Sequence, residues 1–124
     1  MKNKRPVNLD LGSLKYPPMA IASILHRISG LVLFLLLPMM LYVLRLSLIS
    51  QASFDELQLT LTGTLYRLLL WAFSTALIYH VLAGIRHLLM DIGVGEQLGV
   101  GRQSANIVII LAVILTILLG IWIW

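Results

Sequence analysis

Two histidines in one apolar segment are the residues of this sequence best suited to binding a metal-containing ligand. His80 lies deep inside the apolar run, and His87 follows seven residues later, where the run ends. On a helix, residues seven apart share nearly the same face and lie roughly 10 Å apart along the axis. His80 is therefore suited to ligating the iron of a haem, while Arg86 and His87 at the water edge are suited to holding its anionic groups. Alternatively, His80 makes a hydrogen bond between helices, and Arg86 and His87 are ordinary interfacial anchors.

Small residues surround His80 along the same predicted helix. Ala76 lies four residues before it, and Ala83 and Gly84 lie three and four residues after it. These positions share a face, so we expect a groove in which a flat ligand approaches the backbone without meeting a large side chain.

A second polar set lies near the start of an earlier apolar run. Ser23, His26, Arg27 and Gly30 follow one another at helical spacing and share one face. A hydroxyl, an imidazole and a guanidinium at a membrane boundary can hydrogen-bond a carbonyl-bearing amphiphile or an anion, and Gly30 leaves space beneath them. The alternative is that Arg27 is a topology charge, Ser23 a capping or back-bonding hydroxyl, and His26 a contact to lipid headgroups.

The composition identifies the class of protein that must position these residues. Of 124 residues, 60% are hydrophobic and only 11% are charged, which indicates an integral membrane protein. Cysteine is absent, which excludes disulfides and iron-sulfur ligands on this chain. The net charge of +4 is modest, and we interpret it as membrane topology and not as binding of nucleic acid.

We expect an all-α fold with a single membrane-anchor domain over residues 1–124. A hydrocarbon core about 30 Å thick needs roughly 20 helical residues. An aqueous arm comes first, the first helix begins near Met19 after two prolines, and Gly93 to Gly101 form a flexible loop before the last span. The expected segments are the arm at 1–18 and transmembrane helices at about 22–48, 63–90 and 104–124.

The distribution of charge predicts the orientation of this multi-pass chain. The arm is rich in lysine and arginine, whereas the link between the first two spans, from Ser47 to about Thr62, carries only acidic charges. The positive-inside rule then places the N-terminus in the cytoplasm and the C-terminus on the opposite side. The polar face of the first helix and the end of the second therefore meet in one leaflet. His80 and His87 are too far apart to ligate one iron from both sides. If haem is bound through two axial histidines, the second must therefore come from another polypeptide.

Three sequence motifs resemble the cytochrome b large membrane-anchor subunit of succinate dehydrogenase, especially its proteobacterial form. They read RPVNLDL near the start, SILHRIS in the first span and HVLAGIRHLLMDIG in the second. The resemblance covers essentially the whole chain. The residues that fill the motif positions are Arg5, Pro6, Ser23, His26, Arg27, Ser29, His80, Gly84, Arg86, His87 and Asp91.

The resemblance implies that the chain is an anchor subunit of succinate:ubiquinone oxidoreductase in a bacterial inner membrane. His80 would be an axial ligand of a haem b whose other ligand comes from the small membrane-anchor subunit. Ser23 and Arg27 would line the ubiquinone site, formed together with the iron-sulfur subunit and the small anchor. His26, Arg27, Arg86 and His87 would lie at the haem propionates. Succinate itself would be oxidised on the flavoprotein subunit.

Two alternatives remain for the function of the chain. The first is an anchor of a quinol:fumarate reductase, which runs the same reaction in reverse. The second is a haem-free structural anchor, in which His80 only makes a hydrogen bond between helices.

Overall fold

The structure, a computed structural model, describes residues 16–124 and is helical through most of that range. It contains α1 (Pro18–Ile49), α2 (Gln51–Leu61), α3 (Thr64–Asp91) and α4 (Leu98–Ile123). Of these, α1, α3 and α4 are long and apolar enough to cross a membrane. The expected all-α fold with three spans is therefore confirmed. The basic arm, including Arg5 and Pro6 of the first motif, lies outside the described residues.

The helix ends follow local backbone chemistry more than the limits of the apolar runs. Pro17 precedes α1 in an extended conformation, and α1 begins at Pro18, one residue before the expected Met19. Proline suits a first turn because its missing N–H has no partner there in any case. At the other connection, Gly93 and Gly95 adopt positive φ angles of 85° and 82°, and α4 begins directly afterwards at Leu98. The expected loop at 93–101 is therefore too long, and its last residues belong to α4.

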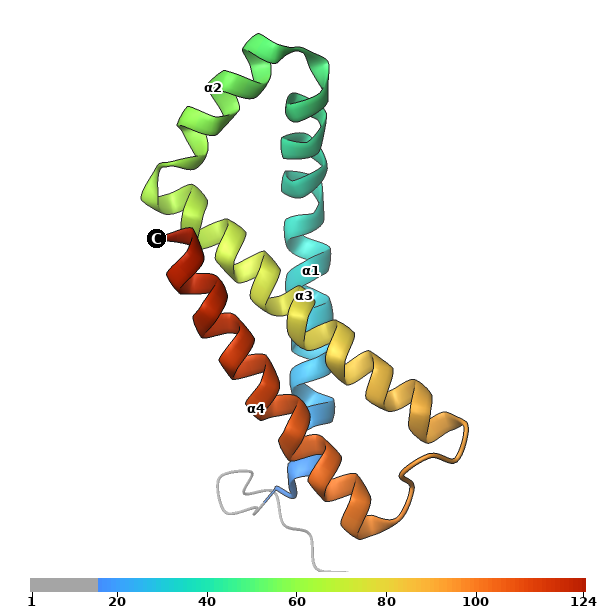
Figure 1. Cartoon of the computed structure of the whole chain (residues 1–124). Helices are drawn as coiled ribbons and strands as arrows, with labels where there is room; N and C mark the ends of the chain where they lie inside the picture. Colours follow the sequence, from blue (N-terminus) through green and yellow to red (C-terminus); the bar gives the residue numbers. More distant parts are fainter. Residues whose placement is uncertain (1–15) are drawn as a thin grey trace, which may run out of the picture.

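The polar link between the first two spans is itself helical. Ser50 caps α2, accepting a hydrogen bond from the backbone N–H of Ser53 at 3.1 Å. The side chain of Gln51 donates to Asp55 across one turn at 2.8 Å, and the Ser53 hydroxyl donates to the carbonyl of Leu46 in α1 at 2.7 Å. As a result α2 folds back beside the end of α1 before α3 begins (Figure 1).

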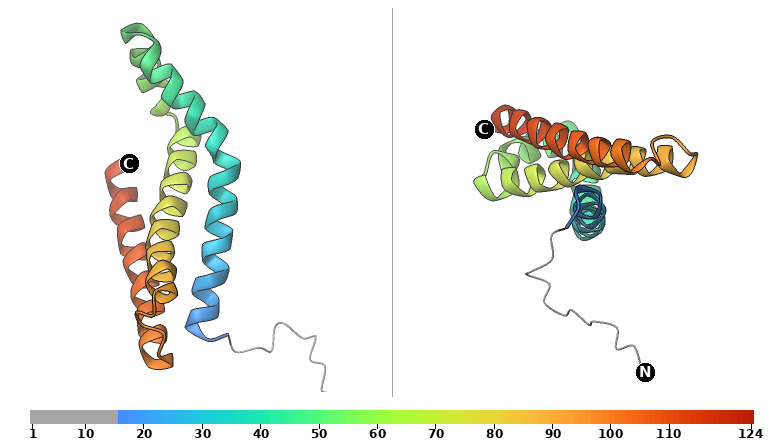
Figure 2. Two further views of the ribbon diagram at one scale, coloured as in Figure 1. Left: turned by 90° about the vertical axis from the view of Figure 1, so that its right-hand side faces the viewer. Right: turned by 90° about the horizontal axis from the view of Figure 1, so that it is seen from below.

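Helix α3 is the central element of the bundle. Figure 2 shows it between α1 on one side and α4 on the other, and it also shows α1 bending along its length. Pro38 lies within α1, where a proline removes a backbone hydrogen bond and favours a kink. The closest helix contacts use small side chains, which allow the backbones to approach. The most deeply buried of these are Ala22, Ala83, Ala105 and Ala112.

The packing positions α3 differently against its two neighbours. The Tyr79 hydroxyl donates to the carbonyl of Ala22 in α1 at 3.0 Å. On the side of α4, Ala83 packs with Ala112, and the indole N–H of Trp71 donates to the carbonyl of Thr116 at 3.1 Å. These contacts set the rotation of α3, and therefore which of its polar side chains face each neighbour.

Candidate functional site

The three histidines of the chain gather where α1 crosses α3. The rings of His26 and His80 stack, with centroids 4.2 Å apart and planes 17° apart. The ring of His87 lies 5.1 Å from that of His26 and is tilted by 45°. The predicted meeting of the polar face of α1 with the histidines of α3 is therefore confirmed.

One ring nitrogen of His80 is held by the backbone and side chains of α1. Its Nδ1 lies 3.1 Å from the Ser29 hydroxyl and 3.3 Å from the carbonyl oxygen of His26. The Ser29 hydroxyl in turn donates to that same carbonyl at 2.7 Å. A carbonyl only accepts hydrogen bonds, and the single hydroxyl proton is already used, so all three contacts are satisfied together only when Nδ1 carries the proton.

The other nitrogen, Nε2, then carries a lone pair. Within residues 16–124 it has no hydrogen-bond partner, and it is not sealed from its surroundings. A metal-ligating histidine usually has this arrangement, because a hydrogen bond at Nδ1–H fixes the tautomer, orients the ring and raises the basicity of the ligating nitrogen. His80 is therefore prepared to donate Nε2 to a metal.

Gly30 provides the space for the His80 ring. A Cβ atom added at Gly30 would lie 3.1 Å from Cε1 of His80, which is tighter than ordinary van der Waals contact. At Gly84, on α3, an added Cβ would lie 3.6 Å from Nε2 of His26. The two glycines therefore flank the histidine pair, and only Gly30 presses closely on it.

His26 presents an unsatisfied polar atom beside His80. Its Nε2 is buried and makes no hydrogen bond to the described residues. A buried polar nitrogen without a partner is unfavourable and calls for an explanation such as a bound ligand. This atom is available to a polar group of a bound ligand.

The described residues provide one metal donor here and not a complete ion site. No group of three or more histidine, cysteine or acidic side chains in residues 16–124 has an arrangement that would hold a metal ion. The three imidazoles are stacked or tilted against one another and do not converge on one point. His80 is therefore suited to supply one ligand to a metal whose other ligands lie outside these residues.

Ser23 and Arg27 lie on the first turns of α1, one turn apart. Ser23 is half-buried, Arg27 is exposed, and neither side chain makes a hydrogen bond to another residue between 16 and 124. Both lie on the helix that carries His26, so the expected polar face exists. Its side chains have hydrogen-bonding capacity toward groups outside the described chain.

Arg86 faces away from the histidines and toward α4. Only 6% of its surface is exposed. Its Nε donates to the Ser104 hydroxyl at 3.0 Å, and its Nη2 donates to the carbonyl of Gly101 at 3.1 Å. The guanidinium predicted at the water edge beside His87 is instead buried in the contact between α3 and α4.

The expected groove of small residues near His80 is closed at two of its three positions. Ala83 is 1% exposed and packs with Tyr79 and Ala112, and Gly84 faces His26. Ala76 instead lines a cavity of about 590 Å³ among α1, α3 and α4, which Ser29 also lines. The reasoning from sequence also gave Ser29 no role beyond its motif position, although its spacing of three from His26 indicated the back-bonding that places its hydroxyl against His80.

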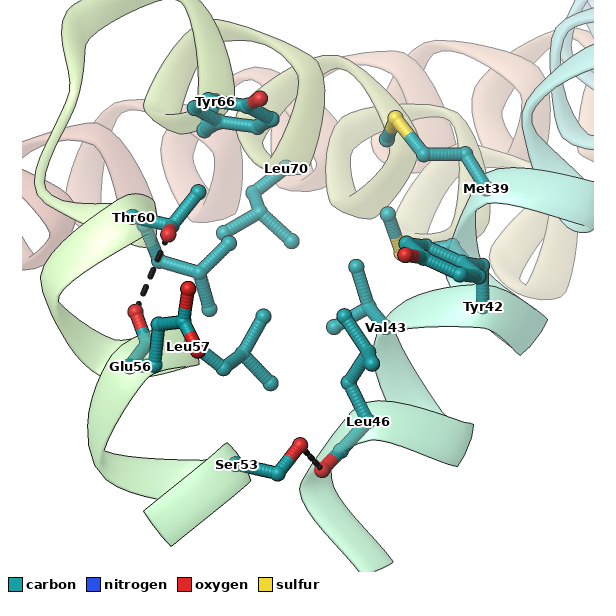
Figure 3. A pocket seen from close by; sticks show the side chains of 12 residues that line it. Met39, Tyr42, Val43, Leu46, Ser53, Glu56, Leu57, Thr60, Tyr66 and Leu70 are labelled. Atoms are coloured by element: carbon teal, nitrogen blue, oxygen red, sulfur yellow. Dashed lines mark hydrogen bonds between the residues drawn. The ribbon is translucent and has the colours of Figure 1, made fainter. Parts of the chain in front are cut away.

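A separate cavity of about 370 Å³ lies at the other end of the bundle, among α1, α2 and α3. Figure 3 shows the carboxylate of Glu56 and the ring of Tyr66 around a space lined mainly by apolar side chains such as Leu46 and Leu70. No histidine lines it. It is therefore distinct from the histidine cluster.

Comparison with known proteins identifies relatives over essentially the whole chain. A family model described as succinate dehydrogenase/fumarate reductase transmembrane subunit matches residues 1–119. The chain is 49% identical over 125 residues to the succinate dehydrogenase cytochrome b556 subunit of Coxiella burnetii, covering 100% of both chains. It is 34% identical to the protein of that name from Rickettsia typhi, covering 96% of this chain and 93% of the relative, and 30% identical to that from Paracoccus denitrificans, covering 94% and 90%.

Proposed function

This chain belongs to the succinate dehydrogenase/fumarate reductase transmembrane subunit family, and from that premise we propose that it is the haem b-binding anchor subunit of a succinate:ubiquinone oxidoreductase. In this role it anchors the flavoprotein and iron-sulfur subunits to the membrane and forms part of the ubiquinone reduction site. The relatives named above are cytochrome b556 subunits of succinate dehydrogenase, which favours this function over quinol:fumarate reduction.

The observation that carries the proposal is the state of His80. Its Nδ1–H is anchored by the carbonyl of His26 and by Ser29, which leaves Nε2 as an oriented lone pair. If His80 only joined two helices, its Nδ1 hydrogen bonds would explain its position. The buried Nε2 of neighbouring His26 would then still lack a hydrogen-bond partner. A haem iron ligated by His80, with a propionate near His26 and His87, accounts for both atoms.

When bound, the haem would supply a centre that takes up and releases one electron in the dry interior of the membrane. The residues of this chain orient it and tune its environment. Ser29 and the His26 carbonyl fix the ring plane of His80, and Gly30 leaves that ring its space. The other protein ligand would come from the small anchor subunit, because the three imidazoles are stacked or tilted and do not converge on one point.

Ser23 and Arg27 are the proposed quinone ligands. A hydroxyl and a guanidinium can donate hydrogen bonds to a quinone oxygen, and the positive charge favours the negative charge that develops there on reduction. Both lie on the first turns of α1, the same helix that carries His26 and Ser29. With the basic arm in the cytoplasm of a bacterium, this end of the bundle faces the iron-sulfur subunit.

The test is the difference spectrum, dithionite-reduced minus oxidised, of the complex purified through a tag on this chain. We expect a b-type spectrum in the wild type and its loss or shift in His80→Ala. Leu88→Ala is the control, since Leu88 lies on α3 with an exposed side chain and has no proposed role in binding haem. A normal spectrum in His80→Ala, or no haem in a wild-type complex that retains its soluble subunits, would contradict the proposal.

A further inference from the structure

A cavity of about 320 Å³ lies between the end of α3 and the beginning of α4. Most of the residues that line it are apolar, and its two polar lining side chains are those of Arg86 and Ser104. Three of the wall residues, Ile85, Leu89 and Ile107, are also exposed on the outer surface of the bundle, so the cavity opens sideways toward the surrounding lipid. It is lined by residues of α3, α4 and their connection, and by no histidine.

Arg86 brings an uncompensated positive charge into this cavity. It is more than nine-tenths buried, and its two hydrogen bonds go to neutral oxygens, those of Ser104 and Gly101. Its remaining terminal nitrogen, Nη1, has no partner within residues 16–124 and is not enclosed by them. No acidic side chain is among the residues that line the cavity.

A buried guanidinium of this kind needs an anion. Burying an unpaired charge is unfavourable unless a counter-charge or strong hydrogen bonds replace the lost water. The start of α4, at the same cavity, also favours a negatively charged ligand. Val100 in the first turn of α4 lines the cavity, and Gln97 makes no side-chain cap there. The start of a helix carries a partial positive charge that favours anions.

The position of the cavity selects the kind of anion. It lies where the end of one membrane-spanning helix connects to the start of the next, with exposed apolar side chains and a buried charge among its lining residues. A phosphate with attached acyl chains matches both parts, because the phosphate oxygens take the guanidinium N–H groups and a chain covers Ile85, Leu89 and Ile107. A haem propionate does not match, since the histidines lie on the α1 side of α3 and this cavity lies on the α4 side.

We propose that this cavity is a phospholipid site, in which Arg86 and the start of α4 bind the phosphate and the apolar walls hold an acyl chain. Bound lipid would stabilise the α3–α4 connection and neutralise the buried charge of Arg86. The site is independent of haem and quinone binding. Arg86, expected from the sequence at a haem propionate, is turned toward α4 in the structure, and no other residue of the cavity has a proposed role in haem or quinone binding.

The test uses the intact complex, stripped of loosely bound lipid in mild detergent and titrated with phosphatidylglycerol while bound lipid is counted by native mass spectrometry. Monoglucosyl diacylglycerol, which has the same chains and no phosphate, is the control lipid. We expect the wild type to bind phosphatidylglycerol at least about tenfold more tightly than the glycolipid, as loss of a charge-assisted hydrogen bond implies. Equal binding of the two lipids would overturn the proposal, as would competition by inorganic phosphate alone.

Two variants separate the charge from the cavity. Arg86→Gln removes the charge, and Ile107→Phe fills the cavity while leaving Arg86 in place. Each should weaken phosphatidylglycerol binding about tenfold or more, whereas Ile121→Phe, on the exposed surface of α4 away from the cavity, should bind as the wild type does. If Arg86→Gln fails to assemble, Ile107→Phe decides the question. Unchanged lipid binding in Ile107→Phe, or a shifted haem potential with unchanged lipid binding in Arg86→Gln, would overturn the assignment.

Discussion

Replacing Ser29 by alanine tests how the chain orients its proposed haem ligand. The Ser29 side chain is almost fully buried, with 6% of its surface exposed. Its hydroxyl accepts a hydrogen bond from Nδ1–H of His80 at 3.1 Å and donates to the carbonyl of His26 at 2.7 Å. In Ser29→Ala the His26 carbonyl, at 3.3 Å from Nδ1, becomes the only remaining acceptor for His80.

The expected effect is a rise in the midpoint potential of the haem. A hydrogen bond accepted from Nδ1–H makes a ligating imidazole more basic, and a more basic ligand stabilises oxidised iron over reduced iron. One neutral hydrogen bond contributes about 1 kcal/mol, which is roughly a fivefold change in an equilibrium constant. For a one-electron couple this corresponds to roughly 40 mV. If the ring moves toward the His26 carbonyl, part of the hydrogen bonding is kept and the shift is smaller, so about 40 mV is an upper value.

The assay is a potentiometric titration of the haem absorbance in the purified complex. Ser47→Ala is the matched control, because Ser47 donates to the carbonyl of Leu44 on the same helix with the same spacing and the same 2.7 Å distance. It therefore loses an equivalent back-bond far from His80. An unchanged or lowered potential in Ser29→Ala, or an equal shift in Ser47→Ala, would refute the assignment of Ser29 as a positioning residue for His80.

Two further predictions concern the same end of the bundle. Gly30→Ala should lower haem content or shift the haem spectrum, because an added Cβ would lie 3.1 Å from the ring of His80 and such overpacking costs about 1–3 kcal/mol. Gly84→Ala is the control and should keep a wild-type spectrum, because its nearest contact is 3.6 Å. Equal effects of the two substitutions would contradict the role of Gly30 in packing. Arg27→Ala should lower quinone reductase activity by about tenfold or more through loss of a charged hydrogen bond. Haem content and succinate oxidation with an artificial acceptor should stay normal. Arg45→Ala, at the other end of α1, should leave quinone reduction unchanged, and full activity in Arg27→Ala would show that Arg27 does not bind quinone.

The sequence was sufficient to predict the three spans and the meeting of two polar faces. Long apolar runs leave a chain few options in a membrane, and proline marks the beginning of α1. Because consecutive spans run in opposite directions, the start of α1 and the end of α3 had to lie at one end of the bundle. From this topology we predicted that the polar face of α1 and the histidines of α3 lie in the same leaflet. The structure confirms this, because the rings of His26 and His80 stack.

The finer contacts depend on how each helix is rotated, and that is not encoded in any local pattern. Arg86 and His80 lie six residues apart on one helix, and their opposite roles arise because one faces α4 and the other faces α1. The partners of Arg86 were also hidden, since Gly101 belonged to the expected loop and Ser104 was only the first residue of the expected third span. The helix at Gln51–Leu61 had a local signal in the Ser50 cap, but its polar composition suggested an ordinary link.

The carbonyl oxygen that holds His80 belongs to the main chain of His26. Every amino acid has this oxygen, so no single-residue replacement at position 26 can delete it. A substitution at position 26 would therefore remove the ring that stacks on His80 but keep the backbone acceptor for Nδ1. The main chain of α1 and the side chain of His26 thus act on His80 separately.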